Sequence, residues 1–82
     1  MAVISGITFA GYMDRPEELI GGGKRRCLYI CDDSTAAASL PTTAGLELAN
    51  GAVTAVPAPG SLALVCGGDT LVLKTGGSWG AL

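Results

Sequence analysis

The sequence predicts an all-β fold: a small antiparallel meander of hairpins with an extended N-terminal arm, completed by oligomerisation. Short runs of strand-forming residues alternate with glycine-rich turn signals, the chain has only 82 residues, and 13 of them are glycine. Short strands at regular spacing are typical of antiparallel sheets. A chain of this length buries only about 60–65% of its unfolded surface, so a core of its own gives marginal stability.

We expect residues 1–44 to form an N-terminal arm with the first strands, acting as a docking segment. Residues 3–9 predict a strand with Gly6 as a bulge, and residues 14–20 carry a helix-start pattern that the glycine run 21–23 ends within a turn or two. The compact apolar run 27–31 predicts a second strand. Residues 34–43 are small and polar and include Pro41, so we expect a loop or an extended crossing segment.

Residues 45–82 form the expected C-terminal β-hairpin unit, which belongs to the same single domain. The segment 45–56 predicts a hairpin with a type I′ turn at Asn50-Gly51, because these residues tolerate positive φ. Residues 61–74 predict a second hairpin around a glycine turn, and residues 78–82 a terminal strand. The strand starting at Leu62 is apolar on both faces. Such strands are normally covered on both sides, which again predicts association.

Composition and charge argue against several functions. The chain has no histidine, so we expect no catalytic residue, no cofactor and no metal site. Glu17-Glu18 and Asp32-Asp33 are typical of solvated turns. The glycines before Lys24 do not make a phosphate loop, because the first glycine and the hydroxyl after the lysine are missing. The net charge of −2 disfavours a nucleic-acid partner, and the absence of a long apolar run predicts no membrane partner. Without catalytic residues, we expect no small-molecule substrate.

Four residues are candidates for an interface: Lys24, Arg25, Arg26 and Trp79. The three basic residues form the chain's one basic cluster. A solvated or acid-paired segment, contact with an acidic protein, and contact with nucleic acid all remain open for it. Trp79 is the single tryptophan, and it either anchors the last hairpin to the core or serves as an intersubunit anchor.

Cys27, Cys31 and Cys66 make an odd count. On one strand face Cys27 and Cys31 lie roughly 13 Å apart, too far for a mutual disulfide. Buried free thiols are one interpretation, and a bridge across strands or between subunits is the other.

Residues 57–82 contain the series P-G-S, apolar strand, short turn, apolar strand, G-x-W, which ends at Trp79. This series resembles small virion proteins of tailed bacteriophages, of the head-decoration, head-fibre and tail-associated types. The resemblance implies a virion structural subunit, made in the host cytoplasm. It also implies a homotrimer that docks to a major capsid or tail protein and reinforces the particle. In the oxidising surroundings after lysis, Cys27, Cys31 or Cys66 then become candidates for intersubunit disulfides.

Two other classes remain open from the sequence. One is a free-standing binding or regulatory β module that acts on a protein partner by adding an exposed strand. The other is an enzyme fragment or an accessory subunit.

Overall fold

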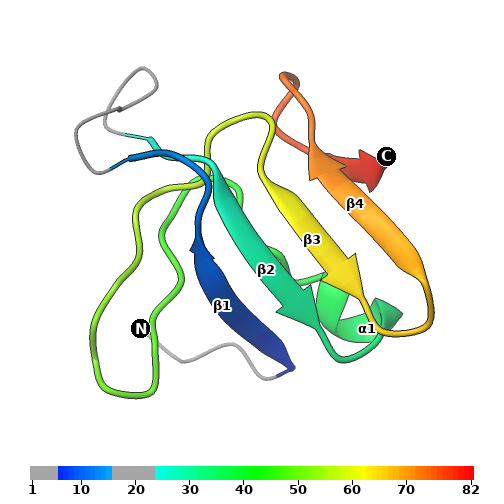
Figure 1. The fold of residues 1–82 in the computed structure, drawn as a ribbon, viewed down its shortest axis with the longest axis horizontal. Coiled ribbons are helices and arrows are strands. Elements are labelled where there is room, and N and C mark those ends of the chain that lie inside the picture. Colours follow the sequence, from blue (N-terminus) through cyan, green and yellow to red (C-terminus); the bar gives the residue numbers. More distant parts are fainter. Residues whose placement is uncertain (1–5, 16–23) are drawn as a thin grey trace.

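The computed structural model describes residues 6–15 and 24–82, and they form one five-stranded sheet in the order β1-β2-β3-β4-β5 (Figure 1). The all-β prediction is confirmed. The elements are β1 (Ile7–Tyr12), β2 (Cys27–Cys31), α1 (Ser34–Ala37), β3 (Leu62–Val65), β4 (Asp69–Leu73) and β5 (Trp79–Ala81). Residues 1–44 and 45–82 contribute strands to the same sheet, so the two regions fold together.

The sheet is antiparallel at every junction except one. The hairpin β3-β4 and the terminal strand β5 form the predicted antiparallel meander. In contrast, β2 and β3 run parallel, with Leu28 opposite Leu62 and Cys31 opposite Val65. A parallel pair needs a long crossover connection. Residues 32–61 provide it, and they return the chain to the starting end of β2.

A β-turn over residues 58–61 ends this crossover and positions Ser61. The Ser61 N–H donates to the Ala58 carbonyl at 3.1 Å, and Gly60 has φ +98. Proline at the second position and glycine at the third match a type II turn. The turn places the Ser61 Oγ where it accepts from the Cys27 N–H at 3.0 Å and donates to the Ala58 carbonyl at 2.7 Å. A buried serine therefore joins the starts of β2 and β3.

The hairpin expected around Asn50-Gly51 is present only as an isolated bridge between Glu47 and Val53, and its turn is not type I′. The Gly51 N–H donates to the Leu48 carbonyl, and Gly51 is the turn residue with positive φ, at +85. This is a three-residue loop, a type I turn followed by a left-handed glycine. The Asn50 side chain accepts from the Ala52 N–H at 3.0 Å, which satisfies the turn without positive φ at the asparagine.

The segment 34–43, expected to be a loop, begins with the short helix α1. Its N-cap is Asp33, whose carboxylate accepts from the Ala36 N–H at 2.8 Å. Aspartate is a favoured N-cap and alanine the best helix former, so this cap followed by an alanine run stabilises one turn.

The first strand also lies later than predicted. β1 covers Ile7–Tyr12, and its irregularity falls between Phe9 and Gly11 rather than at Gly6. Gly6 instead forms a turn with φ +80, where an added Cβ would approach the Ala36 Cβ to 2.8 Å. Residues 3–5 of the predicted strand, and most of the helix start predicted over 14–20, lie outside the described residues.

The core occupies one side of the sheet only. Tyr29 is fully buried and lies at its centre. The centroid of its ring lies 5.9 Å from that of Phe9 and 6.0 Å from that of Trp79. Ala63 lies opposite Tyr29 on β3. Side chains from the crossover, including Ala37, Leu40 and Leu46, cover this side, and α1 lies behind the strands (Figure 1).

Candidate docking surface

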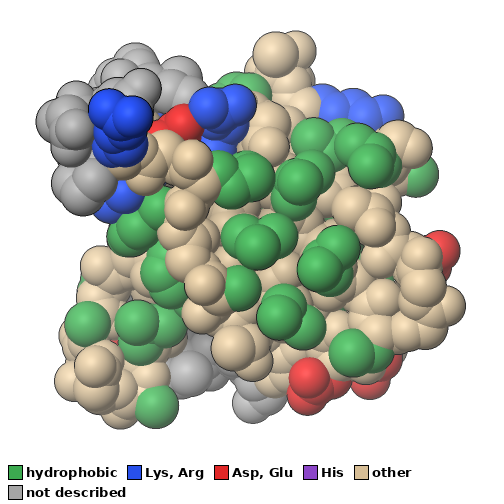
Figure 2. All heavy atoms as spheres, in the orientation of Figure 1, with side chains coloured by type: hydrophobic (Ala, Val, Ile, Leu, Met, Phe, Trp, Pro, Cys, Tyr) green, Lys and Arg blue, Asp and Glu red, His purple; other side chains and the backbone are tan. Residues whose placement is uncertain are grey.

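The other side of the sheet, called the open face below, is apolar and is covered by no described segment. Side chains alternate between the two faces along each strand. The register of β2, β3 and β4 therefore brings every second side chain of these three strands together on this face. Ile30 and Leu64 are 38% and 45% exposed, and three half-buried neighbours complete the apolar centre: Leu28, Leu62 and Val72. Figure 2 shows hydrophobic side chains gathered over the middle of this face.

An antiparallel sheet that faces water on one side normally alternates apolar and polar residues. In β2 and β3 the expected polar positions are instead isoleucine and leucine, so both faces of these strands are apolar. A contiguous apolar patch on a protein surface marks an interaction site. The structure therefore bears out the two apolar faces predicted for β3 and shows that the described chain covers only one of them.

Charged residues lie at the two ends of the sheet, on both of its sides: Asp33 caps α1, and Asp69 pairs with buried Val65 and so faces the covered side. The basic residues 24–26 precede β2 and Lys74 follows β4, which puts them at the same end of the sheet. Asp32, Asp33 and Asp69 lie at the opposite end, where β2 ends and β4 begins. Figure 2 shows blue side chains along the upper border and red ones along the lower right border.

Two of the predicted interface residues bind their own chain. The Arg25 guanidinium lies 3.5 Å from the centroid of the Tyr12 ring and donates to the Asp14 carbonyl at 2.7 Å. Arg26 donates to the Asp14 carboxylate from its backbone N–H at 2.9 Å and from Nε at 3.0 Å. These hydrogen bonds lower the pKa of Asp14 below its ordinary value. The pairing ties the end of β1 to the start of β2, whereas Lys24 is exposed.

Lys74 extends the basic end over the sheet. A Cβ added to Gly80 would lie 3.1 Å from the Lys74 Cε, and Gly80 pairs with Val72. The stem of Lys74 therefore lies against the open face of β5. No local sequence pattern indicates this placement, because it depends on a glycine opposite Val72.

The three cysteines differ in their exposure to solvent. Cys27 and Cys31 are fully buried, and burial raises the pKa of both thiols. Cys66 is exposed in the turn between β3 and β4. A disulfide to another subunit can form at Cys66 without moving β2, whereas Cys27 and Cys31 would have to leave the core. Among residues 6–15 and 24–82, no group of three potential metal ligands lies together.

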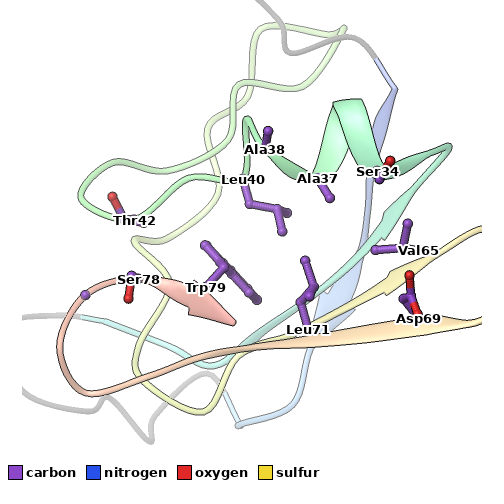
Figure 3. A pocket seen from close by; sticks show the side chains of 11 residues that line it. Ser34, Ala37, Ala38, Leu40, Thr42, Val65, Asp69, Leu71, Ser78 and Trp79 are labelled. Carbon is purple, nitrogen blue, oxygen red and sulfur yellow. The ribbon is translucent and has the colours of Figure 1, made fainter. Parts of the chain in front are cut away.

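Trp79 lies on the covered side of the sheet, away from the open face. Its indole N–H donates to the Pro41 carbonyl at 3.0 Å, which fixes the crossover to the last strand. The ring also borders a pocket of about 450 Å³ between α1 and the β4-β5 hairpin. In Figure 3 the side chains of Leu40, Leu71 and Trp79 point toward one another in this pocket.

The pocket is mainly apolar at its base and polar at its margin. Ser34 and Asp69 lie at one side, and Thr42 and Ser78 at the other (Figure 3). Its volume is within the range of about 300–1,000 Å³ typical of ligand pockets. It is formed by residues 34 to 79, far apart in sequence, so no local pattern could have predicted it.

Comparisons with protein families, with curated proteins and with solved structures find no match for this chain. Within the described part of the chain, no helix has the length and apolar character needed to cross a bilayer.

Proposed function

We propose that this chain is a non-enzymatic structural subunit of a virion, which decorates or reinforces a phage capsid or tail by docking to the major structural protein. The observation that carries the proposal is the open face. A small domain with an apolar centre on its outer sheet surface gains stability when another protein surface covers that centre.

The arrangement of the surfaces supports a bridging role. The open face lies on one side of the sheet, and the apolar pocket beside Trp79 lies on the other. A subunit with apolar surface on both sides contacts two neighbours at once. Each contact adds an interface that must break before the particle opens, so the mechanism is mechanical.

The setting comes from the resemblance of residues 57–82 to small virion proteins, and the structure gives that series a physical basis. Pro59 and Gly60 form the turn that positions Ser61, and Trp79 closes the pocket. These features hold β3, β4 and β5 as one unit while leaving the open face available to a neighbour.

A particle experiment tests the proposal. Particles from a culture of the source are separated on a density gradient, and the chain and the major capsid or tail protein are measured in each fraction. We expect the chain to band with intact particles at a constant ratio. We also expect particles made without the chain to release their nucleic acid at a lower temperature. A chain that stays in the soluble fractions would contradict the proposal and favour the free-standing binding module.

A further inference from the structure

The outermost strand β5 carries backbone groups that have no partner in the described part of the chain. Leu73 donates to the Ser61 carbonyl at 2.9 Å and accepts from the Gly60 N–H at 2.8 Å, so its backbone bonds are made on the β3 side. Its register partner on β5 is Trp79, whose N–H and carbonyl therefore point away from β4. Peptide groups alternate in direction along an antiparallel strand, so those of Ala81 point the same way.

The hydrogen bonds at the two ends of β5 agree with this alternation. The Lys74 N–H donates to the Ser78 carbonyl at 2.9 Å, and the Leu82 N–H donates to the Thr70 carbonyl at 3.1 Å. The residues that flank β5 thus bond to β4, and the strand between them presents donors and acceptors outward. A sheet edge of this kind is a template for pairing with another chain.

The pocket beside Trp79 lies directly inside this edge. Its lining includes Leu71, whose register partner is Ala81, so both side chains lie on the covered side. Because Ala81 is small and exposed, the half-buried Leu71 is the outermost large side chain at this level of the sheet. A strand paired with β5 would therefore project the side chain opposite Ala81 over that alanine and into the pocket.

Charge distinguishes one end of the pocket from the other. Asp69 lies at one end, on the same face as Leu71, and Trp79 lies toward the other end (Figure 3). Among the described residues the Asp69 carboxylate has no hydrogen bond or ion pair, and no lysine or arginine lines the pocket. A cavity that is apolar along its length and anionic at one end is complementary to a ligand that has an apolar group and a positive charge.

We propose that β5 and the pocket bind an extended segment of another protein, which pairs antiparallel with β5 and carries a basic residue two positions before a large apolar one. The proposal rests on the proposed function, since it names the chemistry of the neighbour that contacts the covered side. The apolar side chain lies opposite Ala81 and enters the pocket. Because the added strand is antiparallel, the residue two positions earlier lies toward Asp69, and its positive charge faces that carboxylate.

Each part of such a segment has a defined partner. The residues directly opposite Trp79 and Ala81 exchange both N–H···O bonds with them, as hydrogen-bonded pairs do in an antiparallel ladder. In strand addition these backbone bonds give affinity, and pockets for alternate side chains give specificity. An aromatic residue opposite Ala81 also contacts the Trp79 ring, and aromatic pairs contribute beyond the area that they bury.

The probe is an acetylated, amidated hexapeptide of sequence Thr-Arg-Thr-Phe-Thr-Thr, titrated into the isotope-labelled full chain and followed by NMR. We expect saturable shifts of the Trp79 and Ala81 amides and of the Leu71 methyl groups, while Ile30 and Leu64 on the open face stay unchanged. Replacing the phenylalanine of the peptide with threonine removes the group that fills the pocket. We expect this change to raise the dissociation constant by about 10-fold or more.

Methylation of single peptide nitrogens tests the strand pairing. A methyl group on the nitrogen of the phenylalanine removes the donor that faces Ala81, and we expect it to raise the dissociation constant by about 10-fold or more. The matched control carries the methyl group on the next threonine, whose N–H points to the solvent side of the added strand. We expect less than about a threefold change for that peptide, and equal effects of the two methyl groups would overturn the pairing.

Asp69→Asn tests the charge. We expect this variant to bind the arginine peptide about two- to fivefold more weakly, and to bind a peptide with threonine in place of arginine as the unchanged chain does. The control Asp32→Asn makes the same change at an exposed residue that does not line the pocket. Circular dichroism confirms that both variants fold. Equal binding of the arginine peptide by the Asp69→Asn variant and by the unchanged chain would overturn the place given to the basic residue.

A panel completes the test, with leucine, isoleucine or tryptophan for phenylalanine and lysine for arginine. The proposal is overturned if no member shifts Trp79 and Ala81 at millimolar concentration, or if phenethylamine alone binds as tightly as the peptides. These outcomes are separate from the particle experiment. A chain that bands with particles but binds no peptide refutes this inference alone, and one that binds the peptides yet stays in the soluble fractions refutes the virion role alone.

Discussion

Replacing Ser61 with alanine tests how the parallel strand pair is held together. Ser61 is fully buried, and its Oγ accepts from the Cys27 N–H at 3.0 Å and donates to the Ala58 carbonyl at 2.7 Å. Alanine keeps the backbone turn, because the residue 61 N–H still donates to the Ala58 carbonyl. It removes both side-chain hydrogen bonds and leaves the buried Cys27 N–H without an acceptor.

The expected loss of stability follows from these contacts. An unsatisfied buried donor costs about 1–3 kcal/mol, and a further hydrogen bond contributes about 1 kcal/mol, so Ser61→Ala should lower the free energy of unfolding by about 2–4 kcal/mol. With a urea dependence of about 1 kcal/mol per M, the unfolding midpoint falls by about 2–4 M.

Urea unfolding followed by circular dichroism measures this change. All variants are compared at one protein concentration, because association adds to apparent stability. The control is Ser78→Ala, which removes an exposed hydroxyl. A change below about 0.5 kcal/mol for Ser61→Ala, no larger than that for the control, would refute the role given to this serine.

Three further predictions concern the helix cap, the ion pair and the thiols. Asp33→Ala removes the N-cap of α1 and should lower the free energy of unfolding by about 0.5–2 kcal/mol in the same urea assay. Asp14→Asn should destabilise the chain at neutral pH. Because the folded-state pKa of Asp14 lies below its ordinary value of 3.8, its contribution is present above that value and lost as pH falls through the folded pKa. The wild-type and Asp14→Asn stabilities should therefore converge as pH falls from about 5 to 2. Of the three thiols, Cys66 alone should react promptly with Ellman's reagent in the native chain, and all three in denaturant.

Each of these predictions has an outcome that contradicts it. An unchanged midpoint for Asp33→Ala would mean that α1 does not depend on its cap. A stability difference for Asp14→Asn that is constant with pH would exclude the ion pair as its source. Rapid reaction of two or three thiols in the native chain would place Cys27 or Cys31 outside the core.

The sequence predicted the elements that depend on local patterns. The strand over residues 27–31, the hairpin of β3 and β4, and the terminal strand all have short apolar runs bounded by turn residues, and the structure contains them. The two apolar faces of β3 followed from the same alternation. The open face as a whole could be identified only from the strand register, because Ile30 and Leu64 become neighbours through the pairing of β2 with β3.

The remaining features depend on contacts between distant residues. The parallel pairing rests on the Ser61 hydroxyl reaching the Cys27 N–H, 34 residues away, which no periodicity encodes. The Asn50-Gly51 turn was predicted from its dipeptide, but the hydrogen bond from Gly51 to Leu48 selects a three-residue loop. Trp79 was a candidate for core or interface, and its bond to Pro41 became visible only when the crossover was placed against β5.

Solvent access to the open face is the most direct test of its burial by association. Methyl NMR with a soluble paramagnetic agent reports this access residue by residue. We predict that the Ile30 and Leu64 methyl groups are shielded when the chain is bound to particles, while Val53 stays exposed. Ile30 and Leu64 methyl groups that relax as strongly as those of Val53 in the particle-bound chain would contradict the account.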